Sequence, residues 1–351
     1  FVSQARRTRD LWAGSFLLSY LSGHAMKAVL LNDGEIDFPS VGTRDKPEDG
    51  LLNAILHTHE NMSLPNDLTS PKIGSLPNRF KATVPDDFSG TLCEKAMQDA
   101  WLKIANEVWN KFFQHLEGEQ QQDIWKDQVG QFWDISWVIG TSPDGQSDNT
   151  WLDQRKNWRT YMPPVQQGDK CTLMGSWQEL SGFVGATSVG KEKQKEFWDS
   201  IRKHPQIGEL NLGENEHLCA IALIKRLFPY VASDAIGWTF ERDVRSWAST
   251  SYFAAVPWLE AIESNDKALT LSNQYVGLID EHLNDDNQNS IFGEKHTRLG
   301  NLQQRHFNWL DGRLYYRHNI EAEKDTGYKD DQDKFISTKY KTSEAEAKRA
   351  L

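Results

Sequence analysis

The sequence predicts an α+β fold, with a ferredoxin-like domain over residues 1–140 and a mainly helical domain over residues 141–320. The first observation is the order of periodic patterns before residue 141, which runs helix, strand, strand, helix, strand. That order is the ferredoxin-like unit without its first strand. The second observation is that helical periods joined by polar loops dominate afterwards. The third is length, because 351 residues exceed a typical single domain.

The first helix is predicted over residues 1–30. Leu11 and Leu18 lie on one helical stripe, and Trp12 and Phe16 lie on a neighbouring one. A helix that is apolar around this much of its circumference is expected to be buried on more than one side.

The other predicted elements of the first domain are three strands and a second helix. Alternating apolar residues predict strands at 35–39, 79–84 and 132–139, and a sustained helical period predicts a helix at 91–116. The missing first strand of a ferredoxin-like unit is central, and a sheet without it exposes unpaired backbone groups. We therefore expect that the first strand lies upstream of Phe1.

The second half of the sequence is predicted to be helical and then polar. Residues 321–351 are rich in charged side chains and predict a polar linker. The segments predicted as mostly helical are 149–162, 190–204, 214–228, 244–264 and 266–284.

Composition limits the function classes. The formal net charge is −11, which argues against a protein coated in nucleic acid, although a local basic patch is compatible with it. Three widely spaced cysteines argue against a disulfide framework and favour a reducing cytoplasm. No run approaches the roughly 18 apolar residues of a membrane helix, so no membrane partner is expected.

Two arginine-containing segments are candidate anion-binding elements. Arg6, Arg7 and Arg9 stand near the start of the first helix, where guanidinium groups contact phosphates readily. The alternative is a solvated helix end. Asn78 and Arg79 lie in a turn that enters a predicted strand, and a plain turn is the alternative there.

Two cysteines stand where a zinc knuckle would begin. Two Cys-x-x-Cys pairs make a tetrahedral zinc site, but here Cys171 is followed by Met174, and Cys219 is followed by Ala222. His217 is a further candidate ligand. Of the two interpretations, the sequence favours buried thiols that pack as small hydrophobic groups, and it does not favour a bound zinc ion.

The sequence shows no complete catalytic motif. It has no phosphate-binding loop and no nucleophile elbow. Acidic pairs such as Asp86-Asp87 and Asp285-Asp286 stand in polar stretches without the flanking strands of a catalytic metal site. His57 and His59 lie in a polar loop that has no further metal ligand in an obvious pattern.

Residues 1–21 resemble the first palm helix of the large polymerase-palm subunit of the type III-B CRISPR effector (Cmr) complex. Weaker similarities follow in the family's order to about residue 260. They lie at Ile36–Pro39, Leu76–Phe80, Gly168–Gly175, Leu218–Arg226 and Ala248–Ala255.

The resemblance implies a subunit of an RNA-guided antiviral complex whose partners are the other subunits, guide RNA and target RNA. The family uses ATP with a divalent metal to make cyclic oligoadenylate at a second palm, and some members cut single-stranded DNA. The motifs for both activities are missing from this sequence, and the 321–351 linker is expected to lead toward the second palm. The lost knuckle cysteines speak against zinc.

The resemblance also implies which residues face nucleotide, RNA or a neighbouring subunit. These contact residues, implied by analogy, are Arg6, Arg7, Arg9, Ser15, Asn78 and Arg79. The candidate metal ligands are Cys171 and Cys219.

Two other functions stay open, a stand-alone nucleotidyl cyclase-like enzyme and a ferredoxin-like RNA-binding module. The first requires palm carboxylates, and the second requires strand aromatics in the RNA-recognition pattern.

Overall fold

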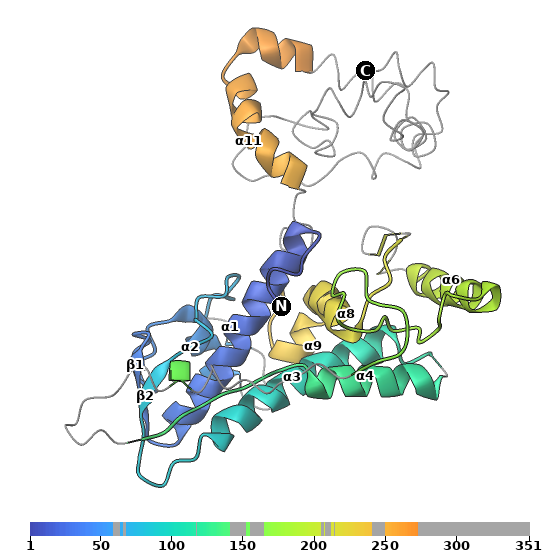
Figure 1. Cartoon of the computed structure of the whole chain (residues 1–351). Coiled ribbons are helices and arrows are strands. Elements are labelled where there is room, and N and C mark those ends of the chain that lie inside the picture. Colours follow the sequence, from blue (N-terminus) through green and yellow to red (C-terminus); the bar gives the residue numbers. More distant parts are fainter. Residues whose placement is uncertain are drawn as a thin grey trace. The chain divides into compact units, whose positions relative to one another are not determined.

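The computed structural model divides into two compact units, residues 1–241 and residues 242–351, and each is described by itself (Figure 1). The predicted domain boundaries at residues 140 and 320 stay predictions, and unit 1 contains residues from both sides of the first. The structure describes residues 1–58, 64–65, 68–116, 118–140, 152–154, 165–204, 207, 212–213, 215–240 and 250–272.

The described part is mostly helical with a small antiparallel sheet, which agrees with an α+β class. No described helix has both the length and the apolar character that crossing a membrane requires. Unit 2 contributes α11, Thr250–Glu263, and a helical segment at 266–272. The elements of unit 1 are α1 (Thr8–Leu31), β1 (Glu35–Phe38), α2 (Gly50–His57), β2 (Lys81–Thr83), α3 (Thr91–Phe112), α4 (Glu119–Gln131), α6 (Ser188–Arg202), α8 (Ala220–Leu227), the 3-10 turn η1 (Phe228–Tyr230) and α9 (Ala232–Ile236).

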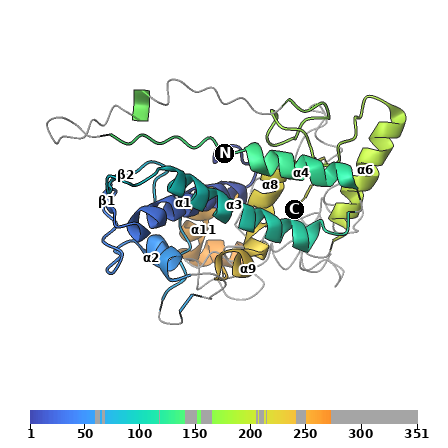
Figure 2. The same ribbon diagram turned by 90° about the horizontal axis from the view of Figure 1, so that it is seen from below.

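Helix α1 is the central element of unit 1, as its apolar circumference predicts. It packs against α2, α3 and α8, and Figures 1 and 2 show α3 running beside it. Phe16 is fully buried, and its ring stacks on Trp12 and Phe228 with centroid separations of 5.6 and 5.7 Å. Phe240 meets the Phe16 ring edge-on at 5.1 Å. Such offset and edge-to-face pairs add to the stabilisation that burial provides.

Residues 72–77, here called the strap, run along one face of α1. The hydroxyl of Ser19 donates to the carbonyl of Leu76 and accepts from the Leu76 amide, both at 2.6 Å. The hydroxyl of Ser22 donates to the carbonyl of Pro77 at 2.6 Å. Small polar residues on this face of α1 therefore let the strap approach closely, and the strap sets the entry into β2.

We expect the Gly74→Ala substitution to destabilise unit 1 by roughly 1–3 kcal/mol, because overpacking forces neighbouring groups apart. A Cβ at residue 74 would lie 2.8 Å from both the Ser15 carbonyl oxygen and the Ser19 Cβ. Gly130→Ala is the matched control, since it lies inside α4 with open space around it. That change should stabilise by about 0.5–1 kcal/mol. Urea denaturation measures both, and equal shifts would contradict the close approach of the strap.

The two strands β1 and β2 form an antiparallel pair, which confirms two of the three predicted strands. Glu35 faces Thr83 and Ile36 faces Ala82, with an irregularity before the next pair. The chain between these strands contains α2, which the sequence did not predict because its surroundings are polar. The Asp49 carboxylate caps α2 by accepting from the Leu52 amide at 2.8 Å, a common start signal for a helix.

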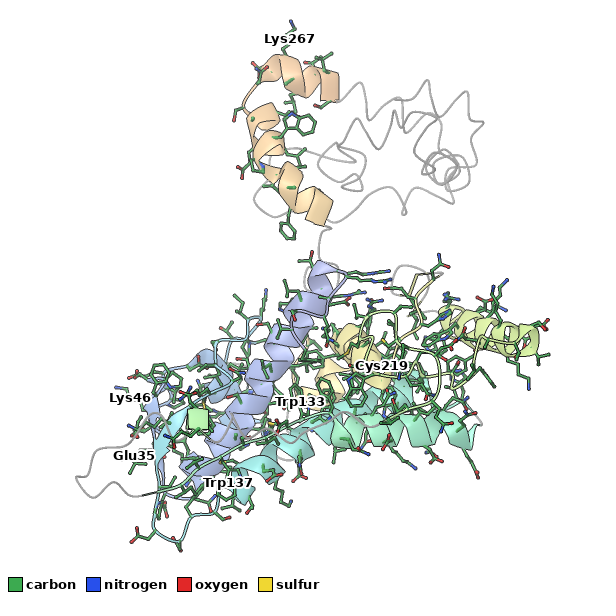
Figure 3. All side chains as sticks on the ribbon, viewed as in Figure 1. Glu35, Lys46, Trp133, Trp137, Cys219 and Lys267 are labelled. Carbon is green, nitrogen blue, oxygen red and sulfur yellow. The ribbon has the colours of Figure 1, made fainter. Side chains whose placement is uncertain are left out.

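The third predicted strand, 132–139, is wrong, because the structure assigns none of its residues to a strand. Side-chain packing, and not a ladder of backbone hydrogen bonds, holds this extended segment. The ring of Trp133 meets that of Phe1 edge-on at 5.1 Å, and the ring of Trp137 occupies the space that a side chain at Gly90 would need. Figure 3 labels both tryptophans. Alternating aromatics gave a strand pattern although each ring packs against a different neighbour.

The remaining helix predictions have mixed outcomes. Those at 91–116 and 190–204 are confirmed as α3 and α6. The helix predicted at 214–228 begins only at Ala220, because residues just before it pair with another segment, as the Leu180 amide bond to the Leu218 carbonyl at 2.9 Å shows. Most of 149–162 and all of the 321–351 linker lie outside the described residues.

Candidate functional site

The structure brings the N-terminal arginines onto the two cysteine-containing segments. The Arg6 guanidinium donates to the carbonyl of Thr172 at 3.0 Å. The Arg7 guanidinium binds the Glu216 carboxylate at 3.3 Å, with about a third of the arginine side chain exposed. Two motifs that the sequence presents far apart therefore belong to one site of unit 1.

A buried ionic network forms the centre of this site. Arg226 donates through Nε and Nη2 to the two carboxylate oxygens of Asp10, at 3.0 and 2.5 Å. Its Nη1 binds Glu216 at 2.6 Å. The Arg226 and Asp10 side chains are each 1% exposed. Asp10 also stands in the first turn of α1, where the helix dipole favours a negative charge.

The network shifts the pKa values of its carboxyl groups. Burial alone raises the pKa of Asp10, but hydrogen bonds and charge from Arg226 outweigh burial, so the pKa lies below its usual value. Burial likewise opposes ionisation of Glu216, and the charge of Arg226 again brings that pKa below the ordinary range. Both carboxylates are therefore ionised at neutral pH, and Arg226 and Arg7 supply two positive charges beside them.

Unit 1 should lose stability in acid because of these two carboxyl groups. A folded-state pKa below the unfolded value adds stability that is complete above the unfolded pKa, about 4 for Asp and Glu. That stability is lost as pH falls through the lower folded pKa values of Asp10 and Glu216. Urea denaturation midpoints across acid pH measure the loss. The Asp10→Asn variant should lose less stability below pH ~4 than the unaltered chain. A loss of the same size in both would contradict the lowered pKa of Asp10.

Lys225 holds the first residues of the chain. Its ammonium donates to the carbonyls of Phe1 and Gln4 at 2.8 and 2.5 Å, and it lies 4.9 Å from the Phe1 ring centroid. Burial lowers the pKa of Lys225 to about 8. These contacts explain why the helix predicted from residue 1 begins only at Thr8, since the carbonyls bind Lys225 and not later amides.

The remaining predicted contact residues divide between two places. Arg9 is largely buried, and its Nη1 donates to the Tyr230 hydroxyl at 3.4 Å. Asn78 is exposed next to Arg79, which pairs with Asp153 at 2.6 Å on an exposed surface.

The strap separates Asn78 and Arg79 from the N-terminal arginines. Ser15 is exposed on α1 beside the strap. Pro77 lies against Ser22, 14 residues after the start of α1 at Thr8, which is roughly 21 Å along the helix axis. The structure therefore does not bring Asn78 and Arg79 to the N-terminal arginines.

The two candidate metal ligands lie side by side. The Cys171 sulfur accepts from the amides of Leu173 and Met174 at 3.4 and 3.2 Å, and the Cys219 thiol is close enough to shift its pKa. The neighbouring Cys219 thiol lowers the pKa of Cys171 to about 7, whereas burial raises that of Cys219. Figure 3 marks Cys219 at the start of α8.

This pair does not fit a structural zinc ion. Such an ion takes four protein ligands, and the two thiols supply two. Within the described ranges, no three His, Cys, Asp or Glu side chains gather in a way that would hold a metal. The ring of His217 instead stacks on Trp198, with a centroid separation of 5.6 Å.

Sequence reasoning missed the acceptors of the arginine cluster. Glu216 and Arg226 were not predicted as members of an ionic network with Asp10, and Lys225 was not predicted as a contact residue. A signal was present, because Lys225 and Arg226 stand together in the otherwise apolar helix Ala220–Leu227. Charged residues are almost never fully buried unless they are paired, so such a position indicates buried partners.

Comparison with known proteins gives a family for the first third of the chain. Residues 1–113 match the family model described as CRISPR-associated protein Cmr2, N-terminal. No curated protein matches the chain in sequence. A chain in the type III-B Cmr-beta cryo-EM structure of the apo state is similar, with 15% identity and a TM-score of 0.42. The similarity covers 77% of this chain and 36% of that one, so this chain spans about a third of that length. The family match over residues 1–113 confirms the predicted resemblance at its N-terminal end.

Proposed function

We propose that the chain supplies the first palm and the adjoining helical region of the large subunit of a type III-B CRISPR effector complex. The family match over residues 1–113 carries this proposal. It spans α1 through α3, which are the elements that build the β1–β2 sheet and its helical cover. The activity of the whole subunit, cyclic oligoadenylate synthesis from ATP, belongs to the proposal as the function of the larger assembly.

The ferredoxin-like palm is a finer part of the proposal. Helices α1 and α3 pack together, and β1 pairs with β2. Among the described residues, β2 pairs with β1 alone, and the extended segment after Phe132 carries exposed apolar side chains at Trp137, Val138 and Ile139. A strand supplied from outside the described residues would satisfy the backbone groups of β2 and of this segment together.

Contacts to RNA, nucleotide or a neighbouring subunit are proposed at the exposed members of the predicted set. Arg6, Ser15 and Asn78 are exposed, whereas Arg7 is partly buried and Arg9 is buried. ATP and its divalent metal are proposed for the complete subunit. Binding and support are proposed as the role of this chain's own residues. A cytoplasmic location remains part of the proposal.

Assembly from purified components tests the proposal. The full-length large subunit would be produced with the other effector subunits and a guide RNA, and assembly would be followed by size-exclusion chromatography and target-RNA binding. We expect Arg6→Glu or Asn78→Asp to weaken assembly or RNA binding. Lys95→Glu is the matched control, because Lys95 is 75% exposed on α3. Failure of the unaltered subunit to join the complex would contradict the proposal.

A further inference from the structure

We propose that Cys171 and Cys219 form a reversible dithiol/disulfide pair, which a small disulfide oxidant such as glutathione disulfide closes. The inference is independent of the proposed function, because it rests on the packing of two segments within unit 1. Cys171 and Cys219 are 3% and 0% exposed.

Backbone hydrogen bonds hold the two cysteine-containing segments side by side. The amide of Thr172, the neighbour of Cys171, donates to the carbonyl of His217 at 2.8 Å. The Leu180 amide donates to the carbonyl of Leu218, the neighbour of Cys219, at 2.9 Å. The two thiols are close enough for each to shift the pKa of the other. A disulfide requires two residues on closely adjacent backbone segments with converging Cβ atoms, and the bond between Thr172 and His217 provides the adjacent segments.

The surroundings favour the thiolate that such chemistry needs. The amides of Leu173 and Met174 both donate to the Cys171 sulfur, and the Lys225 ammonium is close enough to interact electrostatically with both cysteines. The thiolate is the nucleophile in thiol–disulfide exchange, and nearby cations and amide donors stabilise it. Cys171 is therefore the attacking sulfur, and Cys219 is the resolving one.

The reaction balances in two exchanges. The Cys171 thiolate attacks one sulfur of glutathione disulfide, forms a mixed disulfide and releases one glutathione thiolate, which takes up a proton. Cys219 then loses its proton and attacks the Cys171 sulfur, and the second glutathione leaves as a thiol. Two electrons and two protons thus pass from the protein to one glutathione disulfide, which becomes two glutathione molecules.

The bond would fix the start of α8 to the segment that follows Asp169. Lys225 and Arg226, which hold the first ten residues of the chain, stand on this same helix. A cross-link that restricts the unfolded chain stabilises the folded one. The oxidised protein is therefore expected to unfold at a higher urea concentration, and the docked N-terminal segment should be protected with it.

Thiol mapping of the full chain tests the proposal. The protein would be equilibrated in glutathione buffers of increasing oxidised fraction, alkylated and analysed by peptide mass spectrometry. We expect a cross-linked Cys171–Cys219 peptide, with both thiols lost together. Cys93, a free cysteine on α3 whose pKa burial raises to about 11, should give at most a mixed disulfide. The proposal is overturned if Cys171 and Cys219 remain alkylated separately, or each carries its own glutathione, once Cys93 has reacted.

Two variants keep the test specific. Cys93→Ser should leave the cross-link unchanged, whereas Cys219→Ser should abolish it and leave Cys171 free or as a mixed disulfide. The cross-link in the unaltered chain is the primary result, so it does not depend on the folding of either variant. A cross-link from Cys93 to Cys171 or Cys219 in the folded chain would also overturn the assignment.

Discussion

Arg226→Ala is expected to destabilise unit 1 by about 3–5 kcal/mol, because removing one member of a buried ion pair leaves its partner charged and unpaired. Asp10 would lose both of its bonds from Arg226 while staying 1% exposed. Glu216 would lose its shortest ion pair and keep the longer one to Arg7. Urea denaturation followed by circular dichroism measures the change.

Arg79→Ala is the matched control for this prediction. It also removes a guanidinium bound to an aspartate, but the Arg79 and Asp153 side chains are 40% and 58% exposed. Exposed ion pairs contribute only about 0–1 kcal/mol. Equal losses from Arg226→Ala and Arg79→Ala would contradict the buried network. A smaller loss in Asp10→Asn with Arg226→Met than in Arg226→Ala would support it, because the double change removes the unpaired charge.

Phe16→Ala should cost about 3–5 kcal/mol, the usual range for deleting a buried aromatic ring. Phe16 is fully buried, and its ring contacts those of Trp12, Phe228 and Phe240. The cavity would lie between α1 and the segment after α8, so the loss reports on their packing. Thermal and urea unfolding of the full chain provide the measurement.

Leu11→Ala on the same helix is the control for Phe16→Ala. Leu11 is 47% exposed, and a surface substitution of this kind usually changes stability by no more than about 0.5 kcal/mol. If the two substitutions had similar effects, α1 would not be the central helix of unit 1. A small loss for Leu11→Ala beside a large one for Phe16→Ala is the expected outcome.

Hydrophobic periodicity predicted the fold where apolar side chains form the buried face. It gave α1, α3, β1 and β2, but it missed α4 because amides occupy part of the buried face of that helix. Gln128 is fully buried there, donating to the Gln178 carbonyl and accepting from the Ala220 amide, both at 2.8 Å. A hydrophobicity pattern reads such a residue as exposed, although its hydrogen bonds are satisfied within the core.

The candidate site could be predicted only in part, because its partners are far apart in the chain. The arginine cluster and the two cysteines were visible in the sequence. Asp10 and Arg226, however, are 216 residues apart, and no spacing rule connects them. The degenerate knuckle segments position the partners, since the Thr172 amide donates to the His217 carbonyl and Arg226 follows Cys219 on α8. Only the folded arrangement shows that the two motifs form one site.

Purification of the full-length protein from its native host tests the central proposal most directly, namely that this chain is part of the large subunit of an RNA-guided effector. Mass spectrometry would identify the proteins that come with it, and sequencing would identify the bound RNA. We expect the other subunits of a type III-B complex together with short guide RNAs that carry repeat-derived ends. Recovery of a lone protein without RNA, under conditions that preserve such complexes, would contradict the claim.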